Sequence, residues 1–240
     1  MATLGILLCD HVDAVWQPDF GDYDTMFIRL LSQADPTVHF RVYAVNEGDF
    51  PADTTTCDAW LITGSRLSAY DDVAWIQQLS DFIRRCNEQQ HKLAGICFGH
   101  QLIAQALGGT TARAEQGWGV GLHTWQLQQT PPHGLAGDDT LSLLASHQDQ
   151  VQILPPNATR VACSDFCPNA AMQIGEHILS FQGHPEFVCD YAKALMQSRT
   201  DRIPADTIQA GLASLHGHAQ SDRVARWLVG FLVGDRVRSA

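Results

Sequence analysis

The segment Leu93-Ala-Gly-Ile-Cys97-Phe-Gly-His-Gln101 constrains the fold of this chain more than any other. A short apolar run leads into Cys97, and a helical pattern follows over residues 98–107 until a Gly-Gly pair ends it. Gly95 and Gly99 flank the cysteine symmetrically, which predicts a sharp strand-to-helix turn with close backbone approach. A thiol at a helix N-terminus lies in a positive field that favours the thiolate. The segment therefore predicts a nucleophilic cysteine, in preference to one more buried structural thiol.

Predicted strands and helices alternate along the first part of the chain. Strands are expected at 4–9, 38–45, 59–63 and 92–96, and helices at 23–33 and 75–89. This order predicts a three-layer, flavodoxin-like α/β fold, in which helices flank both faces of a mostly parallel sheet. Its site is expected at the carboxyl ends of the strands.

The second part of the chain is richer in strands. Further short strands are predicted at 120–127, 141–146, 159–163, 171–174 and 178–182, with an added small antiparallel region among them. Helices are predicted from the patterns at 188–199 and 222–233. We expect one domain over residues 1–240, with a core to about residue 200 and a helical extension over 201–240.

A second segment, Phe181-Gln-Gly-His184-Pro-Glu186-Phe187, carries residues able to activate the cysteine. The strand predicted at 178–182 ends just before His184, and the proline after the histidine prevents its continuation. Glu186 lies close enough in sequence to accept a hydrogen bond from the imidazole and fix its tautomer. A nucleophile, a base and an orienting carboxylate together form the arrangement of a catalytic triad.

With these motifs the chain resembles the class I glutamine amidotransferases, a Cys-His-Glu group that includes the glutaminase unit of GMP synthase. The resemblance covers roughly Leu4 to Met196 and rests on three motifs: G-I-C-F-G-H-Q at 95–101, S-H-Q-D-Q-V at 146–151 and G-H-P-E at 183–186. It implies a glutaminase reaction through a γ-glutamyl thioester. Cys97 would be the nucleophile, His184 the general acid/base and Glu186 its orienter.

The resemblance implies further site residues. The N–H of Phe98 and an N–H of the Thr63-Gly64-Ser65 turn would form the oxyanion hole. Gln101 would help to bind the glutamine side of the substrate. The amino-acid end would be recognised, largely through backbone groups, by the segment that contains Ser146, His147 and Asp149. No metal or organic cofactor is implied, and the sequence contains no G-x-x-x-x-G-K-[ST] phosphate loop.

An acidic and aromatic loop at 10–24 follows the first predicted strand. A loop of that length in that place can form a lid or recognise what lies beyond the scissile bond. A solvated acidic loop explains the same pattern equally well. On the first interpretation Asp10 and Tyr23 lie at the rim of the site, together with Tyr70 beyond the predicted oxyanion turn.

Composition excludes several classes of protein. The formal net charge of −11 argues against nucleic-acid binding, which needs a basic stripe. No run of apolar residues is long enough for a membrane span, and no signal-peptide pattern is present. The seven cysteines are odd in number and irregular in spacing, which fits reduced thiols of a cytoplasmic protein.

Several functions stay open at this point. The first expectation is a glutaminase whose ammonia passes to a partner synthetase, and the alternative is a stand-alone hydrolase of γ-glutamyl peptides or γ-glutamyl amines. A non-catalytic regulatory module is a third alternative, and the motif at 146–151 speaks against a cysteine protease. A roomy pocket would favour a larger leaving group. An exposed apolar face on the 222–233 helix would favour a partner subunit or a homodimer, whereas a buried face would be core.

Overall fold

Five parallel strands form one part of the central sheet in the computed structural model, which describes residues 1–128 and 139–237. Their order across the sheet is β2 (His39–Ala44), β1 (Thr3–Leu8), β3 (Ala59–Ile62), β4 (Leu93–Ile96) and β11 (Ile178–Phe181). The strands β3, β4 and β11 are fully buried, as expected for apolar strands of a parallel sheet that is covered on both faces.

Antiparallel strands extend this sheet beyond β11. They follow in the order β10 (Ala171–Ile174), β9 (Ala158–Cys163), β6 (Gly119–Leu127) and β7 (Thr140–His147). The strands β5 (Thr110–Arg113) and β8 (Asp149–Ile153) pair separately. The predicted fold class, a mostly parallel sheet flanked by helices with an added antiparallel region, is therefore confirmed.

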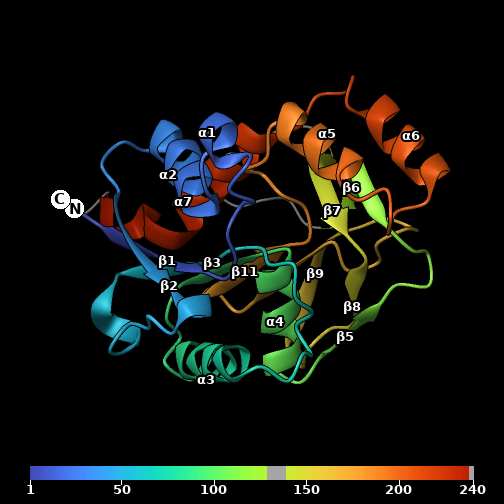
Figure 1. The fold of residues 1–240 in the computed structure, drawn as a ribbon. Coiled ribbons are helices and arrows are strands. Elements are labelled where there is room, and N and C mark those ends of the chain that lie inside the picture. The colour runs from blue at the N-terminus through green and yellow to red at the C-terminus, as the bar shows by residue number, and fades with distance from the viewer. Residues whose placement is uncertain (129–138, 238–240) are drawn as a thin grey trace.

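Helices cover both faces of the parallel strands (Figure 1). One face carries α2 (Tyr23–Ala34) and α7 (Ser221–Val237), and the other carries α3 (Ala74–Glu88) and α4 (Phe98–Ala106). The two faces hold separate apolar clusters, because alternate residues of a strand point to opposite sides of the sheet. In β1, for example, Leu4 and Ile6 belong to one cluster and Leu7 to the other.

Two further helices, α5 (Cys189–Gln197) and α6 (Ala205–Ser214), pack on the antiparallel strands. The short helix α1 (Gln17–Phe20) lies within the acidic loop. Of these, α5 agrees with the sequence pattern, whereas α1, α6, β5 and β8 were missed. The four missed elements are short or weakly patterned, since α6 is rich in small residues and buries only Ile208 and Gly211.

The apolar face of α7 belongs to the core. Five large apolar side chains of this face are buried and pack with α2 and the sheet: Val224, Trp227, Leu228, Phe231 and Leu232. The interpretation of this helix as part of the core is confirmed, and its apolar face is not a docking surface. The last three residues of the expected extension, 238–240, lie outside the described residues.

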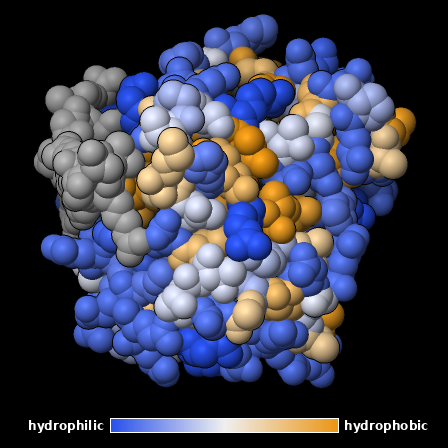
Figure 2. All heavy atoms as spheres, turned by 90° about the vertical axis from the view of Figure 1, so that its left-hand side faces the viewer, coloured by the Kyte–Doolittle hydropathy of each residue, from blue (hydrophilic) through white to orange (hydrophobic). Residues whose placement is uncertain are grey.

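Large apolar side chains are exposed mainly as single residues, such as Val15, Ile153 and Val188. The face of the molecule in Figure 2 is mostly hydrophilic, with small apolar groups between the polar ones. In the described part of the chain, no helix combines the length and the apolar character that a membrane crossing needs.

Candidate active site

Cys97 lies in the sharp turn between β4 and α4. Its backbone has φ +52° and ψ −100°, a strained conformation for a residue with a side chain. The turn is tight because a Cβ on Gly95 would lie 2.6 Å from the carbonyl carbon of Gly99. A Cβ on Gly99 would in turn lie 2.6 Å from the carbonyl oxygen of Ile62. The two flanking glycines therefore permit the close approach that the sequence predicted.

His184 follows β11, the strand that pairs with β4. Its backbone N–H donates to the carbonyl oxygen of Leu144 on β7 at 2.8 Å. Its ring is only 4% exposed, stacks on Phe187 with centroids 3.9 Å apart, and bonds through Nδ1 to Oε1 of Glu186 at 2.7 Å. The geometry of the predicted histidine–carboxylate pair is thus present, with an aromatic ring that holds the imidazole plane.

Cys97 and His184 face the same point above Gly64. A Cβ on this glycine would lie 3.0 Å from Cε1 of His184 and 3.9 Å from the Cβ of Cys97. Burial lowers the pKa of His184, but the charges of Glu186 and Cys97 outweigh burial and hold that pKa well above its ordinary value. The arrangement therefore favours an imidazolium beside the cysteine, which can protonate a leaving group.

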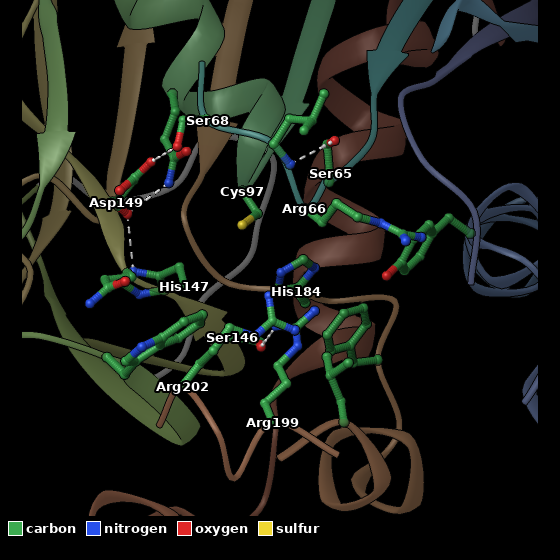
Figure 3. A pocket seen from close by; sticks show the side chains of 18 residues that line it. Ser65, Arg66, Ser68, Cys97, Ser146, His147, Asp149, His184, Arg199 and Arg202 are labelled. Carbon is green, nitrogen blue, oxygen red and sulfur yellow. Dashed lines mark hydrogen bonds between the residues drawn. The ribbon is translucent and has the colours of Figure 1, made fainter. Parts of the chain in front are cut away.

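These side chains open into a cavity of about 230 Å³ (Figure 3). The expected oxyanion turn lines it through Gly64 and Ser65. Phe98 is the first residue of α4, so its N–H has no acceptor within the helix. The backbone next to the thiol thus supplies the kind of donor that an oxyanion hole requires.

The four residues expected to bind substrate all line this cavity: Gln101, Ser146, His147 and Asp149. Gln101 donates through Nε2 to the carbonyl oxygen of Asp149 at 2.7 Å, and the Asp149 carboxylate accepts from Ser68 Oγ at 2.6 Å. Burial lowers the pKa of His147 to about 3, so its ring stays neutral. These bonds therefore hold together helix α4, the start of β8 and the segment around Ser68 that follows the expected oxyanion turn.

The expected rim is only partly brought to the cavity. Tyr23 lines it and shares a hydrogen bond of 3.0 Å with the hydroxyl of Tyr191. Asp10 is not a lining residue, but its carboxylate binds Arg66, which is one. Tyr70 is half exposed and does not line the cavity. The 10–24 loop is folded against α5 and is not simply solvated, since Trp16 and Phe20 both pack on Tyr191.

Several lining residues were not expected from the sequence: Arg66, Phe187, Arg199 and Arg202. Gln182 was also missed, although its amide approaches Cys97 Sγ at 3.6 Å and its Oε1 accepts from Gln101. Phe187 and Gln182 adjoin the His184 motif, a neighbourhood that could have flagged them. The sequence around Arg199 and Arg202 contains no pattern that distinguishes them from arginines at the protein surface. In the described ranges, no group of three or more His, Cys, Asp or Glu is placed to hold a metal ion.

Comparison with known proteins places this site in a family. The family model for "Glutamine amidotransferase class-I" matches residues 19–199, which include every residue of the proposed triad. The chain belongs to the class I glutamine amidotransferase family. The resemblance seen in the sequence motifs is thereby confirmed.

The relatives include gamma-glutamyl peptidases, putative glutamine amidotransferases and a GMP synthase. Gamma-glutamyl peptidase 4 of Arabidopsis thaliana is 35% identical over 175 residues, which are 70% of this chain and 69% of the relative. A putative glutamine amidotransferase of Saccharomyces cerevisiae is 33% identical over 211 residues, 82% of this chain and 83% of the relative. The glutamine-hydrolysing GMP synthase of Bacteroides fragilis is 25% identical over 223 residues, 88% of this chain but 42% of the synthase.

Solved structures share the fold. A glutamine amidotransferase of Methylobacillus flagellatus superposes with a TM-score of 0.72 at 21% identity and covers 97% of this chain and 94% of the other. One of Thermotoga maritima gives the same TM-score at 19% identity, over 97% of this chain and 96% of the other. The fold is thus retained at low sequence identity.

Proposed function

We propose that this class I amidotransferase-type hydrolase cleaves γ-glutamyl amide bonds, and that Cys97, His184 and Glu186 form its triad. One observation carries the proposal: a strained cysteine at a helix N-terminus shares a cavity with a buried histidine that is paired to a carboxylate at 2.7 Å. This is the arrangement of an activated nucleophile with an oriented acid/base.

The reaction follows from these positions. The Cys97 thiolate adds to the γ-carbonyl carbon of the substrate, and the N–H groups of Phe98 and the Gly64-Ser65 turn stabilise the oxyanion. His184 gives its proton to the leaving nitrogen as the C–N bond breaks, which leaves a γ-glutamyl thioester. Water then adds to the thioester after giving a proton to His184, and glutamate and the thiolate are released. Removal of one oxyanion donor typically slows such a reaction by about 10²–10³-fold.

Two substrate classes fit this chemistry. A stand-alone hydrolase of γ-glutamyl compounds is favoured, because the apolar face of α7 is buried in the core and does not offer a docking surface for a partner. The similarity to gamma-glutamyl peptidases supports the same choice. The second candidate is a glutaminase that passes ammonia to a synthetase, which the partial match to GMP synthase supports.

Glutamate release by the purified chain tests the proposal. We expect turnover of glutamine or of γ-glutamyl peptides by the unmodified protein. Cys97→Ala should fold normally, as judged by circular dichroism, and lose at least about 10³-fold in activity, because no other group can form the thioester. Near-normal turnover by Cys97→Ala would refute the mechanism. Glutamine-only turnover would favour the amidotransferase subunit and a search for its synthetase.

We further propose that residues 1–240 act as one catalytic unit in the cytoplasm. The packing of α7 against strands of the core supports a single unit. All seven cysteines are free thiols, including Cys189 at the surface, as is usual in a reducing compartment.

A further inference from the structure

Two arginines that follow α5 reach the cavity that contains Cys97. Arg199 and Arg202 both line it, and the N–H of Arg202 donates to the carbonyl oxygen of Arg199 at 3.0 Å. In Figure 3 both side chains extend toward the cavity from the same segment. The chain carries 26 acidic and 15 basic residues, so a pair of guanidinium groups in one cavity is a marked local excess of positive charge.

Arg199 has polar and aromatic neighbours but no countercharge. Its Nη1 donates to Ser146 Oγ at 3.0 Å, and its Cζ lies 6.0 Å from the centre of the Trp118 ring. Within the described residues, no carboxylate lies within ion-pair distance of its guanidinium. Among the residues that the structure describes, Arg202 forms an ion pair with the exposed Asp201 at 3.8 Å, a contact of small energy.

Burial and a second positive charge nearby make the binding of an anion by Arg199 favourable. Burial lowers its pKa, and the positive charge of Arg202 lowers it further, while Tyr23 acts in the opposite direction. Guanidinium stays charged under all ordinary conditions, so this half-buried cation gains from any anion that enters the cavity. Arg66, the third arginine of the cavity, differs because the Asp10 carboxylate already pairs with it at 2.8 Å.

The position of Arg199 relative to the triad indicates which part of a substrate it meets. The leaving nitrogen must lie next to His184, which protonates it. In Figure 3 Arg199 extends toward His184 and Ser146, whereas Asp149 and Ser68 lie on the other side of Cys97. The segment with Ser146 is expected to meet the γ-glutamyl part largely through its backbone, whereas the Ser146 hydroxyl accepts from Arg199. A group attached to the leaving nitrogen can therefore extend toward the two arginines.

We propose that Arg199, assisted by Arg202, binds the carboxylate of the leaving amino acid, which makes γ-glutamyl amino acids and peptides preferred over γ-glutamyl amines. This proposal rests on the function proposed above and names its leaving group. An arginine fork matches a carboxylate with two parallel hydrogen bonds, and a planar, partly desolvated guanidinium selects that geometry.

Matched substrates and variants test the subsite. The substrates are γ-glutamylglycine, its amide γ-glutamylglycinamide, which lacks only the charge, and glutamine. We expect the unmodified protein to favour γ-glutamylglycine over the amide by at least about tenfold in kcat/KM, as a charged hydrogen bond predicts. Arg199→Gln should bring this ratio close to one, mainly through KM, and Arg199→Lys should give an intermediate ratio.

Arg66→Gln is the matched control, because it removes an arginine of the same cavity that is already paired, and it should leave the ratio unchanged. Arg202→Gln changes an exposed side chain and should lower the ratio partially; it tests the subsite even if Arg199→Gln fails to fold.

Each outcome separates this proposal from the one on which it rests. Equal cleavage of γ-glutamylglycine and its amide by the unmodified protein would overturn the subsite and leave the hydrolase function intact. An equal loss on all three substrates in Arg199→Gln would overturn it as well, since Arg199 would then contact the α-carboxylate that they share. Cleavage of none of the three would instead refute the proposed function.

Discussion

At the scale of single residues, the site depends on a buried histidine with three kinds of support. Glu186 fixes its tautomer, Phe187 holds its plane, and the backbone bond to Leu144 anchors it to the antiparallel part of the sheet. The electrostatic support matters most for the chemistry, because burial alone would leave the imidazole neutral and unable to protonate the leaving nitrogen.

Glu186→Gln isolates this electrostatic support. The amide can still accept a hydrogen bond from Nδ1 but removes the negative charge, so the pKa of His184 should fall. Because activity needs the imidazolium, the alkaline limb of the pH–rate profile should move to lower pH, and kcat should fall by about 10²-fold or more. The measurement is kcat/KM for glutamate release from pH 6 to pH 10. Glu88→Gln at the end of α3 is the control, and an unshifted alkaline limb in Glu186→Gln would contradict the assignment.

At the scale of elements, Cys97, the proposed nucleophile, is placed by the contact of α4 with β3 and β4. Gly99 begins this contact, since its Cα faces Ile62 with no room for a methyl group. The helix could not start at Phe98 in its present position if the residue after it carried a side chain. The strain at Cys97 is thus maintained by close packing at Gly95 and Gly99, two residues to either side.

Gly99→Ala should reveal that packing. A Cβ at this position would lie 2.6 Å from the carbonyl oxygen and 2.8 Å from the Cβ of Ile62, so we expect a loss of about 1–3 kcal/mol in the free energy of unfolding. Gly230→Ala on α7 is the control, because a methyl group there meets nothing within 4 Å and should stabilise the helix by up to about 1 kcal/mol. Urea unfolding measures both. Equal stability of the two variants would show that the turn tolerates a side chain.

At the scale of the whole molecule, the site lies where the parallel and antiparallel parts of the sheet meet. The parallel part supplies Cys97 and His184 at the ends of two paired strands, and the antiparallel part supplies Ser146 and His147. Buried polar groups tie these parts together: His100 on α4 bonds to Ser180 at 2.8 Å and to the carbonyl oxygen of Asn169 at 3.0 Å.

This buried histidine makes stability depend on pH. Burial lowers the pKa of His100 to about 4, so the unfolded chain binds a proton near pH 6.5 that the folded protein does not. The free energy of unfolding should therefore fall with decreasing pH between about 6.5 and 4, with a contribution from His100 of up to about 1.4 kcal/mol per pH unit. Urea unfolding at pH 7.5, 6.5 and 5.5 should show a shallower pH slope for His100→Gln than for the unmodified protein. Identical slopes would contradict the prediction.

The parts of the molecule that could be predicted from the sequence are those set by residues adjacent along the chain. Glycine spacing identified the turn at Cys97, and Pro185 identified the end of β11. The resemblance to the family then placed Gly64, Phe98 and the 146–149 segment. Arg199 could not be predicted, because its role depends on the way α5 packs over the antiparallel strands and on the absence of a nearby carboxylate among the described residues. Neither property leaves a local pattern.

The pairing of β4 with β11 has a consequence for the folding of the chain during its synthesis. Ile96 lies beside Phe181 in the sheet, although the two are far apart along the chain. During synthesis the ribosome releases the cysteine long before the histidine that would activate it. A nascent chain can therefore form much of the sheet and still lack hydrolytic chemistry. The proposed site is therefore complete only when β11 has entered the sheet between β4 and β10.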